Sequence, residues 1–295
     1  MFPSKPAFTE ANLGDLKGKV YVITGANTGV GKELACLLYS KNASVFIAAR
    51  SEEKSQAAIK DVHESHPRST GTVEFLAIDL ADLESVAQAA KVFQSKAERL
   101  DVLFNNAGVM HPPKGSKTKQ GYELQLGVHN LGPVLLTELL TPLMARTAAQ
   151  EAARGAKDGV RVVWVGSLYA ELNTPKGGYE PDNIDYSKRD KSTTYKYSAS
   201  KAGVFYQGTE YARRNKEKGI VSFVSQGDVS GRRLTADAYA AYQPRESQDR
   251  PPTPSWRTPG LHFISGFLAP CCQWCLHGTF CRAVARWHHG EIRNI

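Results

Sequence analysis

Short apolar runs alternate with longer amphipathic stretches over most of the chain, up to about residue 225. The first run, residues 20–23, is rich in β-branched and aromatic side chains, which favour a buried strand. In the stretch that follows it, Leu34, Leu37 and Leu38 fall on one face of a helix. This alternation recurs along the chain and predicts βαβ units with right-handed crossovers, and therefore a parallel sheet.

The predicted fold class is α/β: a doubly wound, Rossmann-type parallel sheet in a single domain with an irregular C-terminal tail. We expect an N-terminal extension at 1–16, a dinucleotide-binding catalytic domain at 17–230 and an atypical tail at 231–295. Pro133 and Pro142 would bend or divide one long helix. The expected strands are 20–23, 43–50, 73–78, 100–104, 161–165 and 220–225, and the expected helices are 32–38, 52–64, 83–97, 121–153 and 195–216, with a loop at 171–194.

Composition and charge narrow the class of protein. The 295 residues are 41% hydrophobic, enough for a sizeable core, and no apolar run reaches the roughly 18 residues that a membrane span needs. The N-terminus lacks the hydrophobic stretch of a signal peptide, so we expect a cytoplasmic protein. The net charge of +8 is scattered rather than gathered in a Lys/Arg stripe with interleaved aromatic residues, which argues against nucleic-acid binding.

The glycines Gly25, Gly29 and Gly31 lie between the first predicted strand and the first predicted helix. Glycines let backbone N–H groups approach a pyrophosphate, and the N-terminus of the helix adds the positive end of its dipole. Glycines also serve ordinary turns, but the strand before them and the helix after them favour a nucleotide site. The sequence therefore predicts dinucleotide binding at the carboxyl end of the first strand.

The end of the second predicted strand discriminates between the two nicotinamide cofactors. An acidic residue there would bind the ribose 2′-hydroxyl of NAD(H), whereas an arginine holds the 2′-phosphate of NADP(H). The chain has Arg50 at this point and no carboxylate before Glu52. We therefore expect NADP(H), with NAD(H) less favoured; the alternative is that Arg50 is an ordinary surface charge.

A phenol and an ammonium, Tyr197 and Lys201, lie one helical turn apart in the helix expected at 195–216. A positive charge nearby stabilises phenolate and lowers the pKa of a phenol from about 10, which lets it exchange protons near neutral pH. Ser167, after the fifth predicted strand, would hydrogen-bond the substrate oxygen beside that phenol. A Tyr/Lys pair alone is common on solvated helices, so this assignment depends on the serine and the glycine turn that precede it.

Together with the Asn-Asn-Ala-Gly after the fourth strand, these motifs resemble the short-chain dehydrogenases/reductases from about Lys17 to about Ser225. The amino-acid sequence of these motifs is similar to that of the retinol-dehydrogenase-like, fungal-type branch of the family. The resemblance implies an NADP(H)-dependent oxidoreductase that interconverts a secondary alcohol and a ketone. It further implies a small-molecule carbonyl or alcohol substrate from secondary metabolism and, by analogy, a homodimer.

The resemblance also implies roles for individual residues. Ser167, Tyr197 and Lys201 would be catalytic, and the last two would also contact the cofactor. The other implied cofactor contacts are Gly25, Gly29, Val30 and Gly31 at the pyrophosphate, Asp79 and Leu80 at the adenine, and Asn106, Ala107 and Gly108 beside the cofactor.

One departure from the family touches the chemistry. The family's fourth catalytic residue is an asparagine two residues before a Leu-Gly pair, and here His129 holds that position. Asn130 lies one step further on, rotated by about 100° around a helix. Either the helix adjusts or the proton relay is impaired, so the alternative function is a cofactor-binding remnant without turnover.

The tail does not fit the family. Residues 244–259 carry five prolines and little apolar patterning, a composition typical of disorder. The codons for residues 272–282, read from the second base, can encode a sequence similar to the final helix of fungal family members, so we favour translation out of frame.

We expect no metal site, although the cysteines after residue 270 raise zinc binding as an alternative: Cys271, Cys272, Cys275 and Cys281.

Overall fold

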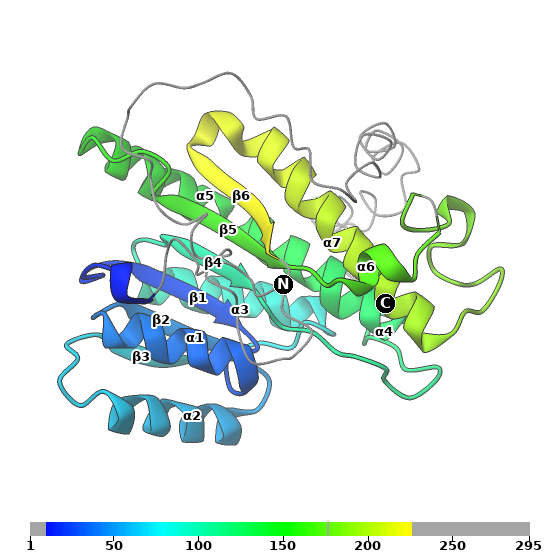
Figure 1. Ribbon diagram of the computed structural model, residues 1–295, viewed down its shortest axis with the longest axis horizontal. Coiled ribbons are helices and arrows are strands. Elements are labelled where there is room, and N and C mark those ends of the chain that lie inside the picture. Colours follow the sequence, from blue (N-terminus) through cyan, green and yellow to red (C-terminus); the bar gives the residue numbers. More distant parts are fainter. Residues whose placement is uncertain (1–9, 176, 226–295) are drawn as a thin grey trace, which may run out of the picture.

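A computed structural model describes residues 10–175 and 177–225. In this part of the chain six strands form one sheet with the order β3-β2-β1-β4-β5-β6, and every neighbouring pair is parallel. The order reverses between β1 and β4, which confirms the expected doubly wound α/β fold (Figure 1). The strands are β1 (Val20–Thr24), β2 (Ser44–Ala49), β3 (Thr72–Ala77), β4 (Val102–Asn105), β5 (Val160–Val165) and β6 (Ile220–Ser225).

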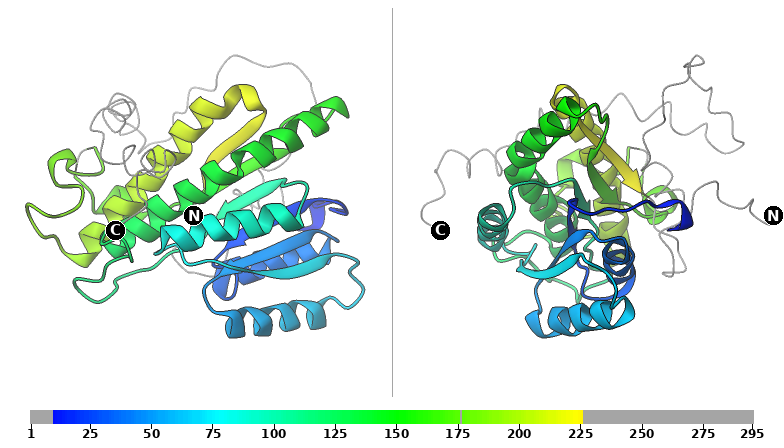
Figure 2. Two further views of the ribbon diagram at one scale, coloured as in Figure 1. Left: turned by 180° about the vertical axis from the view of Figure 1, so that it is seen from behind. Right: turned by 90° about the vertical axis from the view of Figure 1, so that its left-hand side faces the viewer.

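Helices cover both faces of the sheet (Figure 2). Buried side chains of α1 and α2 pack with one set of strand residues, and those of α3, α5 and α7 pack with the other set, so each face has its own apolar core. The helices are α1 (Gly29–Ser40), α2 (Glu52–Ser65), α3 (Leu83–Lys96), α4 (Leu124–Leu126), α5 (Gly132–Ala153), α6 (Tyr169–Leu172) and α7 (Thr193–Asn215). Shorter turns are the 3₁₀ turns η1 (Glu10–Asn12), η3 (Pro181–Asn183) and η4 (Lys216–Lys218) and the π-helical turn η2 (Gly127–Leu131).

The register of the central strands gathers their carboxyl ends at one edge of the sheet. Ile23 of β1 lies opposite Phe104 of β4, and Phe104 lies opposite Val163 of β5. The segments that leave these strands therefore start side by side, at the reversal of strand order where doubly wound folds bind their ligands.

The helix expected at 121–153 begins at Leu124 and is continuous to Ala153 through α4, η2 and α5, so its prolines do not divide it. The irregularity in it is the π-helical turn η2, which precedes Pro133. Pro133 is the second residue of α5, and Pro142 lies inside α5. The loop expected at 171–194 also contains local structure, because α6 reaches residue 172 and η3 follows.

No helix of the described residues is both long and apolar enough to cross a bilayer. Within the same residues, no group of His, Cys, Asp and Glu side chains is arranged to hold a metal ion. The cysteines of the tail and the expected boundary at 231–295 lie outside the described residues.

A cluster of charges joins three elements at the opposite end of the sheet from the glycine turn. The Arg99 guanidinium lies 2.6 Å from Asp101 and 2.8 Å from Glu151, and Lys19 pairs with both carboxylates. The hydrogen bond from Lys19, together with that from Arg99, lowers the pKa of Glu151 below its usual range. The cluster therefore holds the end of α5 to the segments that enter β1 and β4.

Replacing Glu151 by glutamine is expected to make stability less dependent on pH. Because the pKa of Glu151 is lower in the folded chain, its charge stabilises the fold above the unfolded pKa of about 4.3, and this stabilisation is lost as the pH falls through the folded pKa. At pH 7, Glu151→Gln should lower the free energy of unfolding by about 1–3 kcal/mol. Urea denaturation at pH 7 and at pH 4 measures both values, and the difference should shrink at the lower pH.

Glu64→Gln is the matched control, because Glu64 pairs with Lys60 at 3.8 Å on an exposed helix surface. Its loss should change the free energy of unfolding by less than about 0.5 kcal/mol. Equal effects of the two substitutions, or an effect of Glu151→Gln that does not diminish at acid pH, would contradict this account.

Candidate active site

The turn between β1 and α1 can be built only with glycines at its closest approaches. Gly25 has a φ of +70°, and a Cβ on it would lie 2.9 Å from the Cα of Ala107. A Cβ on Gly31 would lie 2.7 Å from Asn106 Nδ2 and 2.8 Å from the Gly25 carbonyl oxygen. Val30 lies in the first turn of α1, whose N–H groups have no partner within the helix. The turn therefore presents backbone donors to an anion at the carboxyl edge of the sheet.

The hydroxyl group of Thr24 ties this turn to the segment after β4. Thr24 is fully buried, and its Oγ1 donates to the Phe104 carbonyl at 3.2 Å. The same oxygen accepts the N–H groups of Asn106 and Ala107, each at 3.0 Å, and Asn106 Nδ2 donates to the Thr24 carbonyl at 2.9 Å. The structure thus brings the glycine turn and the Asn-Asn-Ala-Gly segment together.

Arg50, Asp79 and Leu80 lie on the other side of β1, at the same edge of the sheet. Arg50 directly follows β2 and is exposed. Asp79 follows β3, and its Oδ1 accepts the N–H of Ala81 at 2.9 Å. Leu80 is buried, and its carbonyl oxygen would lie 2.6 Å from a Cβ on Gly132 at the start of α5. Arg50 is thus exposed at the edge and Asp79 is half-buried, whereas Leu80 is packed beneath them.

Tyr197 lies in α7 with three aromatic rings around its own. The ring centroids of His129, Tyr169 and His111 lie 5.6, 5.8 and 6.1 Å from that of Tyr197, each in an edge arrangement. Tyr169 begins α6, and its N–H donates to the Ser167 hydroxyl oxygen at 3.3 Å. The short helix α6 therefore brings the Ser167 turn beside the Tyr197 helix.

Lys201 is buried below the phenol. Its Nζ lies 6.0 Å from the centroid of the Tyr197 ring and donates to the Val165 carbonyl, the last of β5, at 2.8 Å. Burial lowers the pKa of Lys201 to about 8, so that the group is still mainly an ammonium at pH 7. A Cβ on Gly108 would lie 3.7 Å from this Nζ, which places the segment after β4 directly against the Tyr/Lys helix.

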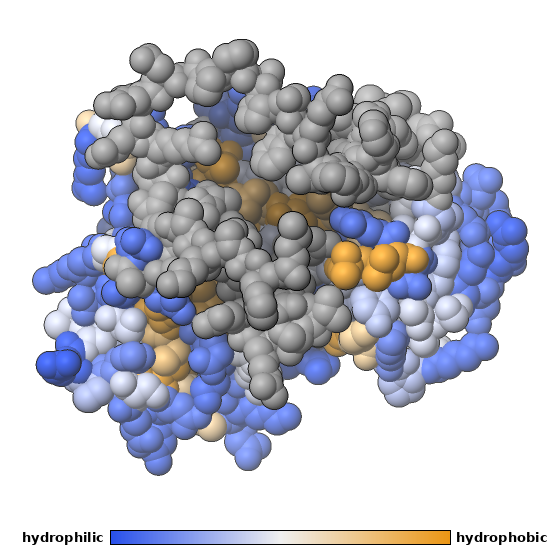
Figure 3. Space-filling model, viewed as in Figure 1, coloured by the Kyte–Doolittle hydropathy of each residue, from blue (hydrophilic) through white to orange (hydrophobic). Residues whose placement is uncertain are grey.

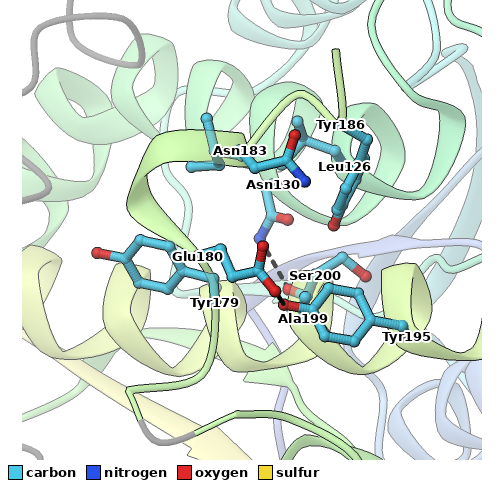
Figure 4. A pocket seen from close by; sticks show the side chains of 11 residues that line it. Leu126, Asn130, Tyr179, Glu180, Asn183, Tyr186, Tyr195, Ala199 and Ser200 are labelled. Carbon is cyan, nitrogen blue, oxygen red and sulfur yellow. Dashed lines mark hydrogen bonds between the residues drawn. The ribbon is translucent and has the colours of Figure 1, made fainter. Parts of the chain in front are cut away.

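His129 and Asn130 face different surroundings. His129 is buried against Tyr197, and its Nε2 accepts the Val109 N–H at 3.0 Å. Asn130 lines a pocket between α7 and the segment at 179–186, where its Nδ2 donates to the Ser200 carbonyl at 3.0 Å (Figure 4). In the π-helical turn, the His129 imidazole therefore lies beside the Tyr197 phenol, and the Asn130 amide does not take that place.

Apolar side chains lie exposed near Tyr197. Met110, which precedes His111, is 51% exposed, and Leu172, at the end of α6, is 67% exposed. Figure 3 shows hydrophobic atoms in orange where Figure 1 places α6, amid a mostly hydrophilic surface. The segments that bring the His111 and Tyr169 rings to Tyr197 therefore also expose a thioether and an aliphatic side chain.

Comparison with known proteins decides the family. The model of the family described as short chain dehydrogenase matches residues 19–178. A short-chain dehydrogenase/reductase of Phomopsis amygdali is 49% identical over 224 residues, which cover 75% of this chain and 65% of that protein. A second one, from Emericella nidulans, is 44% identical over 234 residues, 79% of this chain and 73% of that protein. The chain belongs to the short-chain dehydrogenase/reductase family. The chain thus spans just under two thirds of the length of the Phomopsis relative.

Solved structures share the fold of this chain. An uncharacterized protein from Mycobacterium paratuberculosis is 27% identical, with a TM-score of 0.67 over 93% of this chain and 97% of that chain. The RhlG/NADP active-site complex of Pseudomonas aeruginosa is 23% identical, with a TM-score of 0.54 over 71% of this chain and 72% of that chain, and it shows the shared fold.

Members of the short-chain dehydrogenase/reductase family are oxidoreductases that bind NAD or NADP. The residues present fit such a cofactor, because Gly29 begins α1 and no atom of the described residues lies within 4 Å of a Cβ at that position, which leaves the backbone of the turn open to a pyrophosphate. Gly25, Gly29, Val30 and Gly31 would hold the pyrophosphate, with Asn106, Ala107 and Gly108 beside the cofactor.

Sequence reasoning gave no role to Thr24 or Tyr169 and treated His129 as a loss. For Thr24 there was a usable signal, because a hydroxyl at the end of an otherwise apolar strand has to find a buried partner. No pattern marked Tyr169, since its contact with Tyr197 depends on α6, which lies partly in the expected loop.

Adding a methyl group to the glycine turn should weaken cofactor binding in this family member. In Gly31→Ala the new Cβ would meet the Gly25 carbonyl and the Ala26 backbone, so the turn must shift. We expect the affinity for NADPH to fall by about 10- to 100-fold, which corresponds to roughly 1.4–2.8 kcal/mol. A fluorescence titration with NADPH gives the dissociation constants.

Gly14→Ala is the control, because no atom of the described residues lies within 4 Å of a Cβ at that position. It should leave NADPH binding within about twofold of the wild type, since it adds no contact to the turn. If Gly31→Ala binds NADPH as tightly as Gly14→Ala, the turn does not cradle the cofactor.

Proposed function

We propose that this chain is an NADP(H)-dependent oxidoreductase that interconverts a secondary alcohol and a ketone. The observation that carries the proposal is the convergence at Gly108, which lies against Lys201 on one side and continues the Thr24-anchored segment on the other. The proposed cofactor site at the glycine turn therefore lies at the same edge of the sheet as the Tyr197 phenol and the Lys201 ammonium.

In the proposed reaction a nicotinamide cofactor supplies or accepts the hydride. The Tyr197 hydroxyl donates a proton to the carbonyl oxygen in reduction and accepts one from the alcohol in oxidation. Ser167 holds the substrate oxygen beside the phenol. Lys201, anchored on the Val165 carbonyl, supplies the positive charge that favours phenolate. The apolar approach formed by Met110 and Leu172 supports a substrate with an apolar body.

Arg50 supports NADP(H) over NAD(H) in the proposal. It is exposed directly after β2, the position from which doubly wound folds read the 2′ substituent of the ribose. A guanidinium there is suited to a phosphate by charge and by its planar arrangement of donors.

Other expectations from the sequence stay predictions. They are a cytoplasmic location, a secondary-metabolism substrate, and a homodimer through the long helix and the Tyr197 helix.

Removing the phenolic hydroxyl should abolish turnover without abolishing cofactor binding. Tyr197→Phe keeps the ring and its aromatic neighbours but cannot transfer a proton. We expect kcat for the reduction of a panel of aryl and alicyclic ketones to fall by about 10²- to 10⁴-fold. The NADPH dissociation constant should stay within about threefold. Oxidation of NADPH at 340 nm measures the rate.

Tyr195→Phe is the matched control in the same helix. Its hydroxyl donates to Glu180 at 3.4 Å rather than facing Lys201, so kcat should be retained. Wild-type protein that binds NADPH but reduces no ketone faster than Tyr197→Phe would favour the cofactor-binding remnant over an enzyme.

Arg50→Ser should change the choice of cofactor. Loss of charge-assisted hydrogen bonds to the 2′-phosphate is expected to weaken NADPH binding by about 10- to 100-fold and leave NADH binding unchanged. Arg68→Ser, an exposed arginine before β3, serves as the charge-matched control. Paired titrations with NADPH and NADH decide the matter, and an equal loss for both cofactors would rule out a 2′-phosphate contact.

A further inference from the structure

The His129 imidazole links three segments around the phenol. It is 2% exposed and lies in the π-helical turn η2. Its Nε2 accepts the N–H of Val109, from the segment after β4, at 3.0 Å. Its Nδ1 lies 2.7 Å from the hydroxyl oxygen of Ser200, which donates to the Tyr197 carbonyl at 2.7 Å. One ring therefore joins the expected cofactor segment to the backbone of the proton-transferring residue.

The hydrogen bonds fix the protonation state of this ring. Because the Val109 N–H is a donor, Nε2 must carry a lone pair. The Ser200 hydroxyl donates its hydrogen to the Tyr197 carbonyl, so His129 Nδ1 must be the donor in its bond with the Ser200 oxygen. The ring is therefore neutral, with its hydrogen on Nδ1. Burial, together with the charge of Lys201, keeps the pKa of His129 well below its usual range, which agrees with this assignment.

We propose that His129 is a positioning residue: as a neutral donor–acceptor bridge it sets the separation between the Gly108–Val109 segment and the Tyr197 turn of α7. This inference rests on the proposed function, in which the first segment lies beside the cofactor and the second carries the phenol. His129 itself transfers no proton, since both of its nitrogens are committed to the bridge.

Close packing makes the bridge specific to an imidazole. A Cβ on Gly108 would lie 3.0 Å from Nε2, so that the ring fills the space up to the backbone of this segment. The ring edge also packs against the Tyr197 ring, with 5.6 Å between centroids. A side chain with one polar atom would satisfy either Val109 or Ser200, but not both. The imidazole at this position therefore spans both sides of the gap.

The catalytic test uses two substitutions in His129. His129→Gln keeps an acceptor in reach of Val109 but loses the bond to Ser200, whereas His129→Leu loses both. We expect kcat to fall by about 10-fold in the first and about 100-fold in the second, with KM for the ketone changed less than threefold, because misplacement by about 1 Å costs this much in rate. The ratio of variant to wild-type kcat should be constant from pH 6 to pH 9.

Thr141→Val is the matched control. Thr141 is buried in α5, where its hydroxyl pairs with that of Tyr211 at 2.7 Å, far along the helix from η2. This variant should lower the melting temperature about as much as His129→Gln and leave kcat within twofold. If His129→Gln and His129→Leu behave like Thr141→Val in kcat, the residue is merely structural and the proposal is overturned. A pH-dependent ratio would instead identify a titrating acid or base and would also overturn it.

Two measurements decide the proposal without turnover. In protein labelled with ¹⁵N-histidine, NMR should show the neutral Nδ1–H form of His129 unchanged from pH 6 to pH 8. Amide hydrogen exchange at Val109 should be at least about 10-fold faster in His129→Leu and unchanged in Thr141→Val. An Nε2–H form, or an exchange rate at Val109 that does not respond, contradicts the bridge. If these results hold while the wild type reduces no ketone, the proposed function fails and the bridge stands.

Discussion

The buried hydroxyl of Thr24 is the interaction on which the site depends. It connects segments separated by 80 residues in the chain, at the point where the strand order reverses between β1 and β4. Beyond the last paired residues of β1 and β4 no ladder hydrogen bond holds the two departing segments together, because parallel strands feed into separate connections. The hydroxyl group of Thr24 takes the place of that ladder, because it donates to the Phe104 carbonyl and accepts the N–H groups of Asn106 and Ala107. The glycine turn and the Asn106–Gly108 segment are therefore positioned as a unit.

A second set of buried polar contacts brings the helices of one face to this unit. Lys201 donates to the end of β5, and His129 spans Val109 and Ser200. Lys201 is held by a backbone carbonyl, and His129 by one backbone N–H and one side-chain hydroxyl, so each group holds two elements at a set separation. The distances within the site are thus set by secondary structure, which is stiffer than the loops that would surround a bound substrate.

The sheet and most helices were predictable because their patterns are local. Strands such as 220–225 are nearly continuous apolar runs, and α3 ends within one residue of the expected position. The glycine turn was also legible, since close backbone approach permits no other residue. The contribution of His129 was not, because a one-letter comparison with the family shows a missing amide but not the π-helical turn or the Ser200 hydroxyl. What Tyr169 does was equally hidden, since it depends on a four-residue helix, α6, without its own hydrophobic periodicity.

The π-helical turn η2 requires a fixed number of residues between Gly127 and Gly132. Both glycines are packed against neighbours that leave no room for displacement: a Cβ on Gly127 would lie 2.1 Å from Thr118 Cγ2, and one on Gly132 would lie 2.6 Å from the Leu80 carbonyl oxygen. A single residue deleted between them would convert the wide turn to an ordinary α-helical one and rotate its side chains by about 100°. The imidazole would then leave the phenol, even though every amino acid of the site was still encoded. Between Gly127 and Gly132, a substitution is therefore easier to accommodate than an insertion or a deletion.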